Sequence, residues 1–346
     1  MPHDVHLVGS VPLANAEQVF ITASAALGDR VKRLPDGETG ERSDWITWLE
    51  PLFADNPAFE RSDQVFRLHE QAQPRLRYRL KSGRAIEDVR FDNLFYADIA
   101  QNSYAVLRRL KEAGAIAAGT RFQVDLAPAH SVLWLFLVDE LHAAVDPIYN
   151  AALKREIDKI AAAIPHRELA IQFDVASAVF ARLQRQEASP YGATKAEMQD
   201  RFSSILIDLG NHVPADVELL FHLCYGDSNH RHVVEPIDTG DMVDFTNRLV
   251  QGLERPINLV HMPVPRDRCD DAYFAPLRRL QLPDETALCL GLVHHTDGVE
   301  GTRQRLATAR KHAGKFAIAT ECGFGRRDPQ TIPELLRIHA EVAELE

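Results

Sequence analysis

Short apolar runs recur along the whole chain, and most are continuous rather than alternating between apolar and polar residues. Strands buried on both faces, as in parallel sheets, have this pattern. Most of the runs end at a polar residue that could carry chemistry. The eight runs cover residues 5–10, 30–38, 121–125, 168–174, 217–224, 257–261, 287–295 and 315–322.

Stretches with helical periodicity separate most of these runs. The clearest are 14–27, 92–113, 147–163, 195–209, 241–253, 299–313 and 331–344. Eight strands that alternate with helices predict an α/β fold, a (β/α)8 TIM barrel. The alternative is an open, doubly wound sheet. No glycine-rich phosphate-binding fingerprint follows the first run, however, and this argues against a dinucleotide-binding sheet.

The segment 39–120 is too long for a single strand–helix unit. Within it, residues 66–86 could form a hairpin. We therefore expect one barrel over residues 1–346, with an insertion after the second strand at about residues 60–91.

Composition and charge narrow the class of protein. The 346 residues are 45% hydrophobic and 26% charged, as in ordinary globular proteins. The formal net charge of −11 argues against a partner that is nucleic acid or an anionic membrane. The apolar run 132–138 is too short to span a bilayer, and the first ten residues lack secretory-signal features. We expect a cytoplasmic protein that binds small molecules; its oligomeric state stays open.

The four cysteines, at 224, 269, 289 and 322, lie too far apart for a disulfide framework. His222 and Cys224 form a His-x-Cys pair at the end of the fifth run. Residues two apart on a strand point to the same side, so an imidazole and a thiolate would share one face. Such a pair suits zinc, but it could also be two buried polar residues of a core strand.

Two further residues end apolar runs in the same way. Cys322 ends the last run and His261 the sixth. In a barrel the carboxyl ends of the strands form one face, so both would meet His222 and Cys224 there. Cys322 could equally be an ordinary buried thiol, and His261 a fourth ligand, a general base or a structural residue.

Three carboxylates follow the second, third and fourth runs, namely Glu38, Asp125 and Asp174. A buried acid needs a partner, or its pKa rises. A substrate ammonium would be such a partner; the alternative is a structural pair with Arg42 or a loop amide. Histidines also cluster, since six of the fifteen lie between 222 and 295, which favours a metal or proton-transfer site.

Five short motifs lie in order along nearly the whole chain: VGSVP at 8–12, DGETGERSDW at 36–45, IQFDVASA at 171–178, FHLCYGD at 221–227 and ATECGFGRR at 319–327. They resemble, in turn, Ile-Gly-Ser-Phe-Pro, His-Gly-Glu followed by Glu-Arg-x-Asp-Met, Ile-Gln-Ile-Asp-Glu-Pro-Ala, His-x-Cys-Tyr and Asn-Pro-Asp-Cys-Gly-Leu-Lys-Thr-Arg. These are motifs of the C-terminal catalytic barrel of cobalamin-independent methionine synthase, in the superfamily that also holds uroporphyrinogen decarboxylase.

The resemblance implies roles for several residues. The zinc ligands would be His222, Cys224 and Cys322. The residues that hold the amino-acid part of homocysteine would be Ser10, Glu38 and Asp174.

The chain departs from the family at three places. His261 stands where the family has a glutamate zinc ligand, and His294 or His295 resembles the family's proton donor. The second acid of the family's Asp-Glu-Pro-Ala is also absent, since Val175 follows Asp174.

The resemblance therefore implies a zinc-dependent, cobalamin-independent methyl- or alkyltransferase that activates a small thiol such as homocysteine. A tetrahydrofolate could be the methyl donor, or the acceptor in a demethylase variant. Two alternatives remain open. One is a metal-free, decarboxylase-like barrel enzyme, and the other is a non-catalytic protein that binds zinc or a thiol.

Overall fold

A parallel sheet of seven strands forms the centre of the computed structural model, which describes residues 3–68, 70, 72–226 and 232–345. Neighbouring strands follow one another in chain order, so each connection crosses over through a helical segment. All seven residues of β5 are buried, which explains why its sequence is apolar except at Gln172 and Asp174. The strands are β1 (Arg33–Pro35), β4 (Arg121–Leu126), β5 (Leu169–Val175), β6 (Glu218–Leu223), β7 (Leu259–Pro263), β8 (Ala287–Val293) and β9 (Ala317–Thr320).

The first apolar run closes this sheet into a barrel. Val5 forms parallel bridges with Val31, just before β1, and with Ile318 of β9. The backbone amide of His6 donates to the Ile318 carbonyl at 2.9 Å. The predicted TIM barrel is thereby confirmed, although its first member makes isolated bridges rather than a long ladder.

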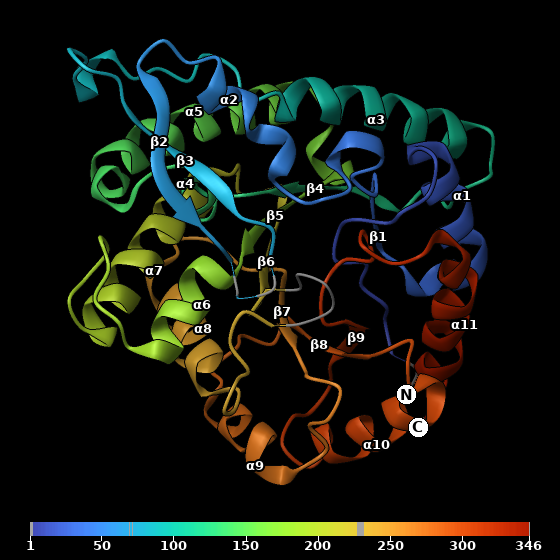
Figure 1. Cartoon of the computed structure of the whole chain (residues 1–346). Coiled ribbons are helices and arrows are strands. Elements are labelled where there is room, and N and C mark those ends of the chain that lie inside the picture. The colour runs from blue at the N-terminus through green and yellow to red at the C-terminus, as the bar shows by residue number, and fades with distance from the viewer. Residues whose placement is uncertain (1–2, 69, 71, 227–231, 346) are drawn as a thin grey trace.

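Long helices surround the strands, as Figure 1 shows. Each overlaps one of the stretches predicted from helical periodicity. They are α1 (Ala16–Leu27), α3 (Tyr96–Glu112), α5 (His142–Ala163), α7 (Lys195–His212), α8 (Gly240–Gly252), α10 (Gly298–Ala309) and α11 (Ile332–Ala343). The two chain ends lie together beside α11, where the His3 amide donates to the Ala343 carbonyl at 2.8 Å.

The start of α5 differs from the expectation. The helical periodicity predicts a start at Pro147, whereas the helix begins at His142 and contains Pro147 in its interior. Proline in this position removes one backbone hydrogen bond. Burial of Val145 and Tyr149 on either side compensates for that loss.

The described residues also form shorter α-helices, namely α2 (Pro51–Ala54), α4 (Ala129–Phe136), α6 (Ser177–Arg185) and α9 (Asp271–Phe274). The periodicity did not reveal α4 or α6. Seven of the eight residues of α4 are buried, as are seven of the nine of α6. A short helix that is buried nearly all round has no polar face to mark its period.

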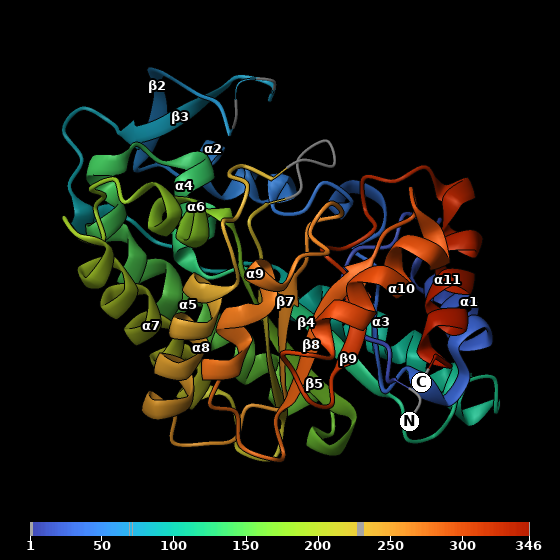
Figure 2. The ribbon, with the colours of Figure 1, turned by 90° about the horizontal axis from the view of Figure 1, so that it is seen from below.

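The predicted insertion is an antiparallel hairpin of β2 (Phe59–Phe66) and β3 (Arg75–Leu80). It follows β1, the second member of the barrel, as expected. Phe66 packs edge-on against Trp134 of α4, and Tyr78 bridges Leu137 just beyond α4. Because α4 follows β4, the hairpin lies over the end of the barrel where the strands finish, as Figure 2 shows.

None of the helices in the described ranges is both long and apolar enough to cross a membrane.

Candidate metal and thiol site

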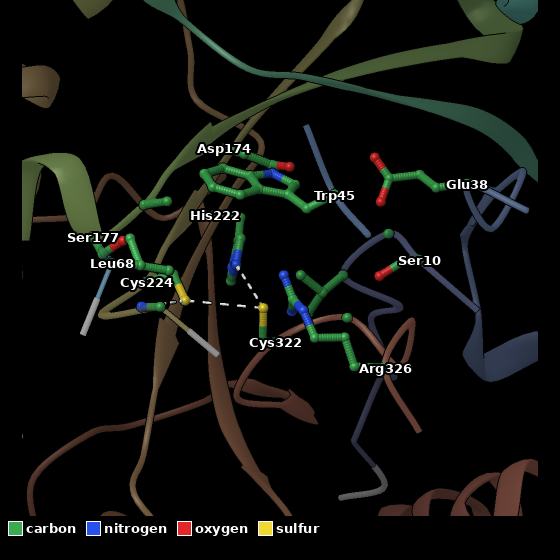
Figure 3. Close-up of a pocket in the computed structure, with 15 residues that line it drawn as sticks. Ser10, Glu38, Trp45, Leu68, Asp174, Ser177, His222, Cys224, Cys322 and Arg326 are labelled. Atoms are coloured by element: carbon green, nitrogen blue, oxygen red, sulfur yellow. Dashed lines mark hydrogen bonds between the residues drawn. The ribbon is translucent and has the colours of Figure 1, made fainter. Parts of the chain in front are cut away.

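Three of the predicted ligands meet at the carboxyl end of the barrel. His222 lies in β6, Cys224 directly after β6, and Cys322 two residues beyond β9. The Cys322 Sγ lies 3.9 Å from both the Cys224 Sγ and the His222 Nε2, as the dashed lines of Figure 3 mark. The three ligand atoms lie within 4.8 Å of one another. Among the described residues, no other group of three His, Cys, Asp or Glu side chains is arranged so that it could hold a metal ion.

The donor set and its spacing fit a zinc ion. Tetrahedral zinc with ordinary bond lengths holds two sulfurs about 3.8 Å apart, and a sulfur and a nitrogen about 3.6 Å apart. The distances here are close to both values before any metal is added. Burial, with His261 and His6 nearby, holds the pKa of His222 well below its usual value. His222 is therefore the neutral imidazole that a metal requires.

His261 lies behind His222 rather than beside the sulfurs. Its Nε2 is 2.9 Å from the Thr320 carbonyl, and its Nδ1 is 2.8 Å from the Nδ1 of His222. A carbonyl only accepts, so His261 carries its proton on Nε2 and its Nδ1 accepts from His222. His222 then bears its proton on Nδ1 and presents an unprotonated Nε2 to the sulfurs. This geometry makes His261 a support for the ligand, not the expected fourth ligand.

A glycine places a backbone donor on one of the sulfurs. The Gly226 amide donates to the Cys224 Sγ at 3.1 Å. Gly226 has φ +91°, and a Cβ there would lie 2.9 Å from Val233 and 3.2 Å from Ser177. Only glycine fits this turn without strain. The amide therefore places a hydrogen-bond donor, with its positive partial charge, beside the Cys224 sulfur.

Beside the three ligands lies a cavity of about 550 Å³, counting its open mouth. Glu38, Asp174 and Ser10, the residues expected to bind an amino acid, all line it. Asp125 lies next to them, because a Cβ on Gly9 would be 3.0 Å from its Oδ2 and 3.9 Å from the Oε2 of Glu38. The three predicted carboxylates therefore gather at one place.

Glutamines orient two of these acids. Gln123 donates to Asp125 at 2.9 Å, and Gln172 donates to Asp174 at 2.9 Å. In each case the glutamine lies two residues earlier on the same strand, so both side chains face the same side. The Gln-x-Asp sequence at the ends of the neighbouring strands β4 and β5 is a signal that could have identified these glutamines.

Among the described residues, no ion pair joins these three acids to a cation, although Arg42 and Arg326 lie close enough to Glu38 to oppose the rise of its pKa. Arg42, considered as a structural partner for them, pairs with Asp36 at 2.7 Å. Burial, reinforced by Asp174, raises the pKa of Glu38 to about 8. Burial also raises the pKa of Asp174 to about 7, although hydrogen bonds from Gln172 and Trp45 oppose the rise. The pKa of Asp125 lies well above its usual value for the same reasons of burial and neighbouring charge.

Two residues of the cavity wall have strained backbones. Glu38 has φ +46° and Trp45 has φ +50°, a region that non-glycine residues rarely adopt. Such outliers concentrate at functional sites, where the surrounding fold holds them in place. Trp45 was missed as a site residue, although it ends the ERSDW motif. With Leu68 and Arg326 it also lines a second cavity of about 880 Å³ under the hairpin.

The structure does not bring the two candidate proton donors into the thiol cavity. His294 donates through Nε2 to the Val264 carbonyl at 2.8 Å, and its Nδ1 is 3.9 Å from the Oε1 of Glu321. It lines a separate cavity with His232, Glu235 and Glu321. His295, the next residue, lines neither cavity. His230 and Asp227, which belong to the histidine cluster and to the fourth motif, lie outside the described residues.

No protein-family model and no curated protein matches the sequence. Solved structures do match the fold. A B12-independent methionine synthase from Shewanella sp. W3-18-1, in complex with selenomethionine, has a TM-score of 0.67 at 13% identity, and the match covers 99% of this chain and 97% of that one.

Two further structures match over a similar length. A putative vitamin-B12 independent methionine synthase from Listeria monocytogenes has a TM-score of 0.54 at 15% identity, covering 99% and 97% of the two chains. A methyltransferase from Methanosarcina mazei has a TM-score of 0.59 at 11% identity, covering 99% and 94%. Over nearly its whole length, this chain therefore has the barrel fold of B12-independent methionine synthases.

Proposed function

We propose that this protein is a zinc-dependent, cobalamin-independent transferase that moves a methyl or other alkyl group to a small amino thiol such as homocysteine. The observation that carries the proposal is the convergence of His222, Cys224 and Cys322 beside a cavity lined by buried carboxylates. The fold likeness to methionine synthases and a methyltransferase supports it.

The three residues would hold zinc through the Nε2 of His222 and the two sulfurs. Three protein ligands leave a fourth position for a substrate atom, as in catalytic zinc sites. A bound zinc ion would stabilise the substrate thiol as its thiolate at neutral pH. The thiolate sulfur forms a bond to the alkyl carbon while the bond from that carbon to the donor's leaving group breaks.

The protein's carboxylates supply orientation rather than bond making. Glu38 and Asp174 would bind the substrate ammonium, a positive charge that would favour the ionised form of both acids. The donor would approach through the neighbouring cavity under the hairpin, which meets the thiol cavity at Trp45, Leu68 and Arg326. A methylated folate as donor, and His294 or His295 as the acid for its leaving group, stay predictions.

The test begins with metal content, measured by mass spectrometry on protein purified without a metal-affinity tag. About one zinc per chain, followed by alkylation of homocysteine in a screen of methyl donors, would support the proposal. A chain without zinc after reconstitution would favour the metal-free, decarboxylase-like alternative. Stoichiometric zinc that no thiol can reach, shown by an unchanged cobalt-substituted spectrum with homocysteine, would favour the non-catalytic alternative.

A further inference from the structure

The cavity under the hairpin has aromatic walls. Trp45, Phe66 and Trp134 line it, and they come from the loop after β1, the end of β2 and the helix α4. Trp45 also lines the thiol cavity, where Figure 3 shows its indole ring next to Asp174. A donor in the hairpin cavity and a thiol beside the metal ligands would therefore meet at Trp45. The family motif has methionine at this position, so the resemblance does not account for the tryptophan.

Two of these rings already attract cations within the fold. The Arg77 Cζ lies 3.9 Å from the centroid of the Phe66 ring, and the Arg182 Cζ lies 5.5 Å from that of Trp134. The two rings meet edge-on, with their centroids 5.6 Å apart. The face of an aromatic ring carries negative potential, and each arginine covers one face of its ring and leaves the other.

The charged residues of the hairpin cavity are paired with carboxylates. The Nε of Arg326 donates to Asp44 at 3.3 Å, and Arg75 lies 3.8 Å from Glu50. These pairs leave the aromatic faces as the groups that distinguish a cation from a neutral ligand of the same shape. Ser131, which is 1% exposed, lines the same cavity, and its hydroxyl has no hydrogen-bond partner among the described residues. A bound ligand would satisfy such a group.

The leaving group of the donor has different needs in different chemical classes. An uncharged nitrogen or oxygen must gain a proton as its bond to the alkyl carbon breaks. His294, which resembles the family's proton donor, bonds instead to the Val264 carbonyl and lines the separate cavity with Glu321. An onium atom already carries a positive charge, so it departs as a neutral thioether or tertiary amine and needs no proton.

We propose that the alkyl donor is an onium compound, a sulfonium or quaternary ammonium ion whose charged centre lies against Trp45, with Phe66 and Trp134 around the rest of the molecule. The inference rests on the proposed function and names its donor class. The acceptor thiolate forms a bond to one methyl carbon of the onium centre. The bond from that carbon to the onium atom breaks, its electron pair stays on the leaving atom, and both charges are neutralised.

The test compares ligands of equal shape that differ by one charge. Glycine betaine is matched by 3,3-dimethylbutanoate, and dimethylsulfoniopropionate by 4-methylpentanoate; each pair shares its carboxylate. Calorimetry or ligand-observed NMR on the full chain should show the onium member of at least one pair binding roughly 3- to 30-fold more tightly. The pair with the larger preference identifies the onium atom, nitrogen or sulfur. No preference in either pair would overturn the inference.

Variants of Trp45 locate the preference. Trp45→Leu should abolish it and leave the neutral ligands within about twofold of their wild-type affinity. Trp45→Phe keeps an aromatic face but loses the indole hydrogen bond with Asp174, so it should retain most of the preference. Phe95→Leu is the control, because Phe95 is an exposed aromatic residue that lines neither cavity. An unchanged preference in Trp45→Leu, or its complete loss in Trp45→Phe, would contradict the role of the ring face.

The two proposals fail separately. A zinc-containing chain that alkylates homocysteine from 5-methyltetrahydrofolate, but not from glycine betaine or dimethylsulfoniopropionate, would keep the transferase and overturn the onium donor. A chain that binds no zinc and alkylates no thiol, yet shows the onium preference and its dependence on Trp45, would keep the onium site and reject the transferase.

Discussion

At the mouth of this barrel, the thiol cavity and the cavity lined by His232 and Glu321 both contain histidines and carboxylates. The pKa shifts of His222 and Glu38 in the first cavity are opposite to those of His232 and Glu321 in the second. In the thiol cavity, His222 faces a histidine and two sulfurs, and its pKa lies well below the usual value. In the other cavity, burial also disfavours the charged form of His232. Hydrogen bonds with Glu235 and Glu321 outweigh this effect of burial, however, and raise the pKa of His232 to about 10.

The carboxylates of the two cavities also differ, because their pKa values are shifted in opposite directions. Burial would raise the pKa of Glu321, but His232 and His294 beside it hold the pKa below its usual range. Desolvation also acts on Glu38, and the neighbouring Asp174 adds to it; Arg42 and Arg326 oppose these effects only in part, so the pKa of Glu38 rises to about 8. In one cavity the carboxylate and the histidines are paired with one another, while in the other the nearby arginines do not offset the desolvation of Glu38. The comparison points to the thiol cavity as the place where a ligand completes the structure.

The largest expected effect comes from removing a sulfur. Cys322→Ala should lose most of the bound zinc and all thiol alkylation, because two remaining ligands do not make a stable zinc site. Metal content and single-turnover alkylation measure the two losses. The control is the Cys269→Ser variant, which should keep its zinc because Cys269 lies outside the ligand group. Normal zinc in Cys322→Ala would mean that the metal is held elsewhere.

Removing the support behind His222 should have the next largest effect. His261→Ala takes away the acceptor that fixes the tautomer of His222, so zinc affinity should fall roughly 10- to 100-fold. Competition with a chelator measures it. His294→Ala, in the cavity lined by His232 and Glu321, should leave the affinity within about twofold. If His261→Glu binds zinc more tightly than the wild type, residue 261 acts as a ligand and not as a support.

Replacing Glu38 by a neutral residue should weaken substrate binding while it raises protein stability at high pH. Glu38→Gln should keep its zinc yet weaken amino-thiol binding by roughly 10-fold or more. Its effect on stability depends on pH. The folded Glu38 binds a proton up to about pH 8, so wild-type stability falls as pH rises from about 4.5 to 8. The variant escapes this loss, and its Tm advantage should be about 2–4 °C greater at pH 8.5 than at pH 5. An equal Tm change at both pH values would contradict the raised pKa of Glu38.

The smallest effect should appear in the cavity lined by His232 and Glu321. His232→Gln removes a protonated partner of Glu321 and should cost roughly 1–2 kcal/mol of unfolding free energy near pH 6. The pKa of His232 is raised, so its contribution is complete below about pH 6.5 and disappears as pH rises towards 10. Urea unfolding at pH 6 and pH 9.5 should show the cost shrink, with zinc content unchanged. A cost that grows with pH would reverse the assignment.

Much of the fold was predictable because buried strands and helices each produce a characteristic local pattern of apolar and polar residues in the sequence. The continuous apolar run of β5 and the helical spacing of α3 and α7 each matched an element. Errors occurred where that pattern is weak, in α4 and α6, or where burial overrode local preference, at the start of α5.

Some features of the site could likewise be predicted from the sequence, and others could not. Cys224 and Cys322 were identifiable because each follows a strand, and parallel strands end on one face. The distinction between His261 as ligand and as support could not be predicted, because it depends on which ring nitrogen meets Thr320. Arg326 was missed because only the closure of its loop on Ser10 brings it into the cavity.

The sequence alone determined the barrel, its insertion and the residue types available at the mouth, since periodicity and strand-end position are local properties of the chain. The tertiary structure alone decided which of those residues meet. Residues from β6, β9 and the loops after them lie about a hundred positions apart, and hydrogen-bond direction and desolvation act only between groups that the fold has brought together. Those two effects make His222 a neutral imidazole and His232 a cation, and they raise the pKa of Glu38.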